Sequence, residues 1–275
     1  MALFVNTNLA SLNAQRNLAG TSSLVSTSLE RLSSGLRINN AYDDSAGLAI
    51  ADKLARDVRV VNQAIRNAND GLSALAIGDK ALGTITDIVT RASELASESA
   101  TGTVSDAQRS SIQNEFAALL SEIDRISSVT TFNGVQLLSP TQTLTIQVGL
   151  DGSTASQISF STADGSTSAL GLTNTGVAVS TQASAQAALG LLTSAIASIA
   201  QSRGKLGAYE SRLLTAISSL QVASENYSAA ESRIRDTDVA AETANLTRGQ
   251  VLQQAGVAVL AQANQQPQLA LKLLQ

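Results

Sequence analysis

The sequence predicts a mainly α-helical protein, an elongated antiparallel helical bundle or coiled coil with a small β-hairpin region. Three observations support this fold. Two long stretches carry apolar residues at three- and four-residue spacing, and a shorter stretch between them carries the same pattern. One segment near the middle alternates apolar with polar residues instead. The first pattern is typical of packed helices and the second of half-buried strands.

The first long stripe predicts a helix over about residues 45–99. At about 1.5 Å per residue such a helix is on the order of 80 Å long, more than the diameter of a compact domain of this size. The sequence therefore predicts an elongated molecule. The apolar positions follow the spacing of a coiled-coil seam: Leu54, Val58, Val61, Ile65, Ala68, Leu72, Leu75, Leu82, Ile85, Val89, Ala92 and Ala96.

Two further helices are expected after a break at residues 101–106. Ser105 and Gln108 form a capping-box pattern, and a short apolar stripe follows them. Because the break is short, this second helix is expected to return antiparallel to the first. A third stripe, from Leu189 to Ile234, is long enough to pair with the first. Together the helices would form a three- or four-helix bundle.

The pattern changes between about residues 130 and 180. Leu144, Ile146 and Val148 alternate with Thr and Gln, and Ile158 and Phe160 alternate in the same way. This period of two predicts a β-hairpin, followed by a loop rich in Gly, Ser and Thr.

Residues 1–44 and 236–275 are expected to form a discontinuous terminal domain, with residues 45–235 as a helical-rod domain. The ends are rich in Ala, Asn, Gln and Ser, with sparse apolar residues. Ordering a residue costs roughly 1 to 2 kcal/mol of backbone entropy. Both ends are therefore predicted to be disordered in the monomer and helical only against partners. The residues expected to be buried in that assembly are Leu18, Val25, Leu29, Leu32, Leu36, Leu246, Val251, Val259 and Leu260.

The composition argues against several classes of function. The 275 residues include no His and no Cys, which removes imidazole and thiolate chemistry, so no enzyme activity, metal site or cofactor is expected. The net charge of −4 and the scattered 18 Lys and Arg residues argue against nucleic-acid binding. No uninterrupted apolar run is long enough to span a membrane, and no secretory signal peptide is expected before Arg16.

Both ends of the sequence resemble bacterial flagellins. The N-terminal match is SLERLSSGLRINNAYDDSAGLAIADKL at 28–54, and the C-terminal match is IRDTDVAAETANLTRGQVLQQAGVAVLAQANQQPQLALKLL at 234–274. TRASELA at 90–96 and SIQNEF at 111–116 extend the resemblance over nearly all of the chain outside about 140–185. The resemblance implies a short flagellin that lacks the outer variable domains of longer members.

The resemblance also implies a function. The terminal segments would pair as the inner helices of a flagellar filament, and the subunit would polymerise with itself for swimming motility. The other implied partners are an export chaperone, the cap protein and hook-associated proteins. Export would use the flagellar type III apparatus, without a cleaved signal peptide, and the filament would be extracellular.

Arg91 and Glu115 match the positions by which the resemblance implies recognition by Toll-like receptor 5, and Leu95 and Ile112, nearby, complete the candidate receptor-recognition set. The favoured interpretation is structural, with Arg91 and Glu115 as solvated charges between helices or contacts between protofilaments. Receptor binding would then be an incidental use of the same surface.

Other interpretations remain open. A hook-filament junction protein would share the terminal patterns, and a secreted ligand of an innate immune receptor is a second alternative. Asp43-Asp44 and Asp236-Thr237-Asp238 invite a metal hypothesis, but their positions at predicted helix ends favour capping. Ser202 and Lys205 form an isolated Ser-x-x-Lys pair without the companion motifs of a catalytic site.

Overall fold

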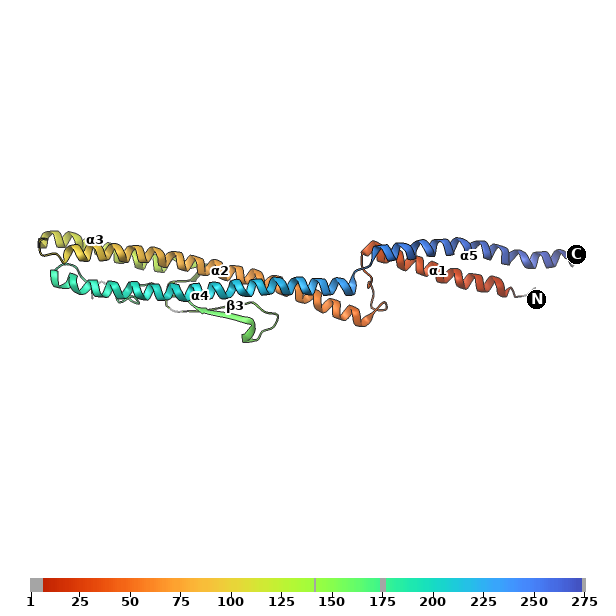
Figure 1. Cartoon of the computed structure of the whole chain (residues 1–275), viewed down its shortest axis with the longest axis horizontal. Coiled ribbons are helices and arrows are strands. Elements are labelled where there is room, and N and C mark those ends of the chain that lie inside the picture. The colour runs from red at the N-terminus through yellow and green to blue at the C-terminus, as the bar shows by residue number, and fades with distance from the viewer. Residues whose placement is uncertain (1–6, 141, 174–176, 274–275) are drawn as a thin grey trace. The chain divides into compact units, whose positions relative to one another are not determined.

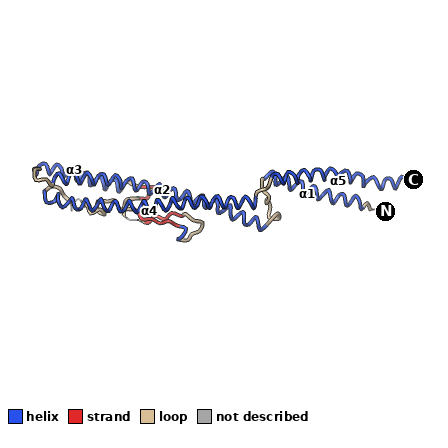
Figure 2. Tube along the Cα trace, viewed as in Figure 1, coloured by secondary structure: helices blue, strands red, loops and turns tan. Residues whose placement is uncertain are grey.

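The computed structural model describes residues 7–140, 142–173 and 177–273, with side chains described as far as residue 265. The described chain is predominantly helical, with four short strands (Figures 1 and 2). This confirms the predicted mainly α fold. The elements are α1 (Leu9–Ser34), α2 (Ser45–Ser99), α3 (Asp106–Val129), β1 (Thr131–Phe132), β2 (Val135–Gln136), β3 (Thr143–Gln147), β4 (Gln157–Ser161), α4 (Gln182–Arg235) and α5 (Val239–Leu273).

The chain divides into two compact units, which are described separately. Unit 1 comprises Met1–Val58 with Glu225–Gln275, and unit 2 comprises Arg59–Ser224. The expected division after residues 44 and 235 followed helix ends. The compact units instead place the first turns of α2 and the last turns of α4 with the terminal helices. One reason is that the segment after α1 bonds the end of α4, where the Arg37 N–H donates to the Arg235 carbonyl oxygen at 2.6 Å.

Unit 2 is an antiparallel bundle. Arg91 of α2 contacts Glu115 of α3, while the later α2 residue Ser99 contacts the earlier α3 residue Arg109, so these helices run in opposite directions as predicted. The predicted stripe on α2 packs into this bundle, with several of its residues fully buried. The largest fully buried side chains of unit 2 are Phe116, Leu75, Leu82, Ile85, Leu95, Leu120, Ile123, Leu138, Leu172, Leu192 and Ile199.

The predicted capping box at the start of α3 is present. The Ser105 side chain accepts from the Gln108 backbone, and the Gln108 side chain accepts from the Ser105 backbone. Arg109 then reaches back to the end of α2, where its guanidinium donates to the carbonyl oxygens of Ser99 and Thr101 at 2.9 Å each. The hydrogen bonds of one buried arginine, Arg109, therefore stabilise the turn between α2 and α3.

The predicted β-hairpin is also present. Strands β3 and β4 are antiparallel, with Leu144 opposite Phe160 and Ile146 opposite Ile158. The hairpin lies against the bundle, because Ile146 Cγ1 is 3.1 Å from the position that a Cβ on Gly71 would occupy.

A second, smaller hairpin was not predicted. Thr131–Phe132 pairs with Val135–Gln136 around a turn at Asn133-Gly134. Both turn residues have positive φ, 49° and 80°. An Asn-Gly turn of this kind matches the twist of two antiparallel strands and is a strong local hairpin signal.

Helix α4 is long and apolar enough to cross a membrane by length and composition, with a mean hydropathy of 1.4 over its best window. This is weak evidence, because the core helices of water-soluble bundles pass the same test. Ser and Thr residues interrupt the apolar run of this helix. Leu192 and Ile199 of this helix are buried in the bundle of unit 2, which accounts for part of its apolar character.

Candidate assembly interface

Helices α1 and α5 pair side by side in unit 1 and run antiparallel (Figure 1). Near the start of α1, the Asn8 side chain donates to the carbonyl oxygen of Ala263 at 2.8 Å, and Ser11 bonds Asn264 at 2.9 Å. Near the end of α1, Arg31 lies 3.9 Å from Glu242 at the start of α5. These contacts fix one register along the pair.

The burial pattern of the pair follows this register in heptads. Along each helix, nearly every residue that is buried or half-buried falls at three- and four-residue spacing, and most of the others are exposed. This is the pattern of a narrow coiled-coil seam. The seam residues are Ser11, Ala14, Leu18, Thr21, Val25, Ser28 and Leu32 on α1, and Glu242, Leu246, Gly249, Gln253, Gly256, Leu260 and Ala263 on α5.

The structure divides the residues expected to be buried on assembly into three groups. Leu36 is half-buried next to α1, where its backbone forms an isolated bridge with Asp236. Leu29, Val251 and Val259 are exposed. The remaining residues of the set lie in the seam and are half-buried: Leu18, Val25, Leu32, Leu246 and Leu260.

The outer faces of the pair carry many large apolar side chains in contact with solvent. Within the described side chains of α1 and α5, the fully buried apolar residues are only Ala14 and Ala263. A helix pair normally buries its apolar stripe, so this surface lacks a partner within unit 1. The exposed residues are Leu9, Leu12, Leu24, Leu29, Val239, Val251, Leu252, Val257 and Val259.

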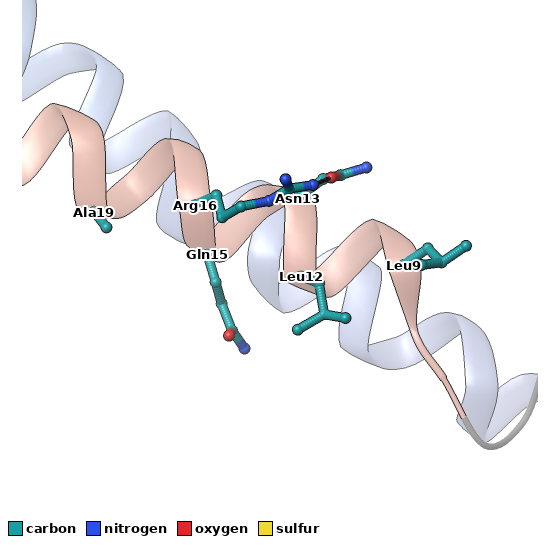
Figure 3. A pocket seen from close by; sticks show the side chains of 6 residues that line it. All are labelled: Leu9, Leu12, Asn13, Gln15, Arg16 and Ala19. Atoms are coloured by element: carbon teal, nitrogen blue, oxygen red, sulfur yellow. Dashed lines mark hydrogen bonds between the residues drawn. The ribbon is translucent and has the colours of Figure 1, made fainter.

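Part of this surface forms a shallow depression of about 380 Å³ on α1. Leu9 and Leu12 supply its apolar part, and Arg16 lies at its edge, where it donates to Asn13. Figure 3 shows these side chains projecting from α1, with Leu12 and Gln15 on the same side. The depression is open and apolar, which suits packing against another protein surface.

The acidic pairs at the helix junctions act as caps, as favoured from the sequence. Asp44 accepts from the backbone N–H of Gly47 at the start of α2. Asp238 accepts from the backbone N–H groups of Ala240 and Ala241 at the start of α5. Asp43 accepts from two N–H groups of the preceding loop, those of Asn39 and Asn40. Each carboxylate therefore satisfies backbone donors that a helix end or turn leaves free.

The four residues assigned to receptor recognition do not share one environment. Arg91 and Glu115 are exposed and bond each other at 2.9 Å. Hydrogen bonds to Glu94 and Glu115 raise the pKa of the Arg91 guanidinium. In contrast, Leu95 is 2% exposed and Ile112 is 8% exposed, and both pack in the core of unit 2. Leu95 and Ile112 therefore pack beneath the surface that carries Arg91 and Glu115, and a receptor contact at either residue stays a prediction.

The isolated Ser-x-x-Lys pair lies at a shallow pocket of about 290 Å³ in unit 2. Ser202 and Lys205 line it together with Asp164 and Tyr209. Asp164 is already engaged by the backbone N–H of Ser166 at 3.0 Å. No hydrogen bond joins Ser202 to Lys205 among the described contacts. The two side chains are therefore not arranged as a nucleophile and its general base in the described structure.

An antiparallel bundle joined to a terminal helix pair with unburied apolar faces defines a class of helical proteins that associate through their ends. Two family models identify the family. The model of the bacterial flagellin N-terminal helical region matches residues 5–143, and that of the C-terminal helical region matches residues 189–274. The chain belongs to the bacterial flagellin family. The predicted family and the predicted role as a structural subunit of the flagellar filament are thus confirmed.

Relatives of similar length support this membership. The chain is 39% identical to the flagellar filament 33 kDa core protein of Treponema phagedenis, over 99% of this chain and 100% of the relative. It is 38% identical to the flagellin of Bacillus subtilis strain 168, over 98% and 99% of the two chains. The crystal structure of Bacillus cereus flagellin is similar with a TM-score of 0.50 and 30% identity, covering 56% of this chain and 88% of that one.

Proposed function

We propose that this chain polymerises into a flagellar filament by coupling the ordering of its terminal segments to their packing against neighbouring copies. The observation that carries the proposal is the set of exposed apolar side chains on α1 and α5. Burying one Val or Leu side chain contributes about 1.5 to 3 kcal/mol. Neighbouring copies can therefore supply the stabilisation that the isolated pair lacks.

The energetics of the isolated pair support this coupling. Helix α1 has 26 residues and α5 has 35, and fixing each backbone costs roughly 1 to 2 kcal/mol. The buried apolar side chains of the pair are alanines, which contribute little burial. We therefore keep the prediction that both segments are disordered in the free monomer and adopt the α1 and α5 helices on assembly.

Self-assembly of the purified subunit tests the proposed function. Heated monomer should form long filaments on cooling or after addition of short filament seeds, as measured by sedimentation and electron microscopy. Contacts that repeat head to tail without closing produce such open polymers. Short, non-elongating particles would instead favour the alternative of a hook-filament junction protein.

The remaining partners are proposed from the family. The export chaperone would hold the unfolded C-terminal segment, and the flagellar type III apparatus would pass the unfolded chain. The cap protein would capture it at the growing tip, and hook-associated proteins would anchor the filament. Disordered terminal segments suit each step, because an unfolded segment passes a narrow channel and does not polymerise early.

We also propose that Arg91 and Glu115 contribute to recognition by Toll-like receptor 5 in the free subunit. Their exposure and opposite charges fit a polar contact at the rim of a protein interface. Arg91→Ala with Glu115→Ala should lower receptor activation by purified monomer several-fold at low salt and less at high salt, because rim charges mainly raise the rate of association.

The matched control is Arg125→Ala with Glu122→Ala. This pair is also exposed on unit 2 and joined by a hydrogen bond within α3. The control should leave receptor activation unchanged. Equal activation by both double variants would remove the receptor hypothesis and leave Arg91 and Glu115 as a link between α2 and α3.

A further inference from the structure

The seam between α1 and α5 contains two places where a large side chain meets a glycine. Val25 Cγ2 lies 2.7 Å from the position that a Cβ on Gly249 would occupy. Leu18 Cδ1 lies 3.4 Å from the corresponding position on Gly256. Side-chain carbons do not approach within 3.0 Å of one another, so even alanine at 249 would push the helices apart or displace Val25. The glycines admit the large residues of α1.

The size relation reverses at the alternate seam positions. In the register given by the contacts of Val25 with Gly249 and of Leu18 with Gly256, Leu246 lies across from Ser28. In the same register Leu260 of α5 lies across from Ala14, two heptads further along the seam. Ser28 and Ala14 are buried, as expected for small residues covered by a large neighbour. Between Ala14 and Ser28, the larger residue of each level therefore alternates between the two helices, with Thr21 and Gln253 as the middle pair.

This alternation discriminates against pairing of like helices. If two copies of α1 paired antiparallel about the middle of the seam, Leu18 would face Val25, while Ala14 would face Ser28. If two copies of α5 paired in the same way, Leu246 would face Leu260 and Gly249 would face Gly256. Such like-helix pairs are overpacked at one level and leave a void at another. Each overpacked level or void lowers the stability of the pair by on the order of 1 to 3 kcal/mol.

We propose that this size interlock is the specificity determinant by which an α1 segment selects an α5 segment during assembly, an inference that rests on the proposed function. Side-chain size, rather than charge, determines which helix pairs, because the seam contains few charged residues. Its described ion pair is the 3.9 Å contact between Arg31 and Glu242. In a growing filament many terminal segments are crowded together, and a seam of alternating sizes accepts only unlike helices.

Polar contacts select the heptad within this interlock. A shift of one heptad would still place Val25 across from a glycine, Gly256, and Leu32 across from Gly249. That shift would break the bond of Asn8 to Ala263 and the backbone bridge between Leu36 and Asp236. Side-chain size therefore determines which helix pairs with α1, and these polar contacts determine the register of the pair.

A size swap tests the proposal in the full-length chain. Gly249→Val alone should raise the concentration needed for filament growth at least tenfold, because two valines then compete for one space. Val25→Gly alone should raise it less, because it leaves a void. The double variant Val25→Gly with Gly249→Val has the same composition as the parent chain and restores one large and one small residue. It should form filaments near the parent concentration.

A cross-link reports the pairing directly. The chain contains no Cys, so the double variant Ser11→Cys with Asn264→Cys carries the sole pair of thiols. A short cross-linker with two thiol-reactive groups can then join them. The cross-link should form in parent filaments, fall several-fold with Gly249→Val, and return in the double swap. Circular dichroism of unit 2 verifies that each variant is folded.

The outcomes separate the two ideas. A double swap that assembles and cross-links no better than Gly249→Val would overturn the interlock. So would Gly249→Val filaments that form at the parent concentration with an unchanged cross-link. A parent chain that cross-links but does not elongate into filaments would contradict the proposed function and support the interlock.

Discussion

Replacing Val251 and Val259 together by Asp should abolish filament formation without lowering the stability of the free subunit. Both side chains are exposed, at 59% and 58%, so the free chain loses no core contact. On assembly, each change removes about 1.5 to 3 kcal/mol of apolar burial and adds the cost of desolvating a carboxylate. The critical concentration measured by sedimentation should therefore rise by at least about 100-fold.

A conservative double variant shows whether the effect comes from the introduced carboxylates or from any substitution at these two positions. Val251→Ile with Val259→Ile keeps both side chains apolar and β-branched, and it should sediment within a few-fold of the parent chain. Thermal unfolding of unit 2 should be the same in all three proteins. Normal filaments from the Asp variant at the parent concentration would show that these outer faces are not buried between copies.

Replacing Phe116 by Ala should give the largest loss of stability in unit 2. Its ring is fully buried where α3 meets the bundle, and it is the largest side chain with that degree of burial. Truncations of this kind cost about 3 to 5 kcal/mol, because transfer energy is lost and a cavity remains. For a unit of this size the Tm should fall on the order of 10 °C.

The matched control for Phe116→Ala is Val129→Ala. Val129 lies on the same helix but is exposed, so the change should shift the free energy of unfolding by less than about 0.5 kcal/mol. Circular dichroism during heating gives both values. Similar Tm values for the two variants would mean that α3 is not packed on the bundle through Phe116.

The long helices could be predicted from the sequence because their signals are local and repeated. The stripe over 45–99 matches α2, and Ser105 with Gln108 marks the start of α3. The hairpin of β3 and β4 could be predicted for the same reason, because apolar and polar residues alternate along both strands. The β1 and β2 hairpin was missed because its strands are two residues long, although Asn133-Gly134 carried the signal.

The terminal interface could be predicted only in part. Sparse apolar residues on 1–44 and 236–275 indicated that these segments need partners. The side on which each residue lies depends on the α1 and α5 register, which polar contacts of Asn8 and Ser11 help to set. A motif match likewise gives no information about which side of a helix faces the core, where Leu95 and Ile112 lie.

The division of the chain also depends on tertiary contacts. The boundaries between the compact units, after Val58 and after Ser224, both fall inside helices, α2 and α4. Periodicity cannot mark such a point, because the helical pattern does not change there. Residues 59–224 form the compact unit that we expect to fold on its own.

Hydrogen exchange of the free subunit and of the filament, resolved by peptide, tests the coupling of folding to assembly most directly. Amides of residues 9–34 and 239–265 should exchange at nearly unprotected rates in the free subunit and become protected in the filament. Amides in the helices of residues 59–224 should be protected in both. Slow exchange of the two terminal segments in dilute free subunit would contradict the account, because stable terminal helices would then exist without burial against neighbouring copies.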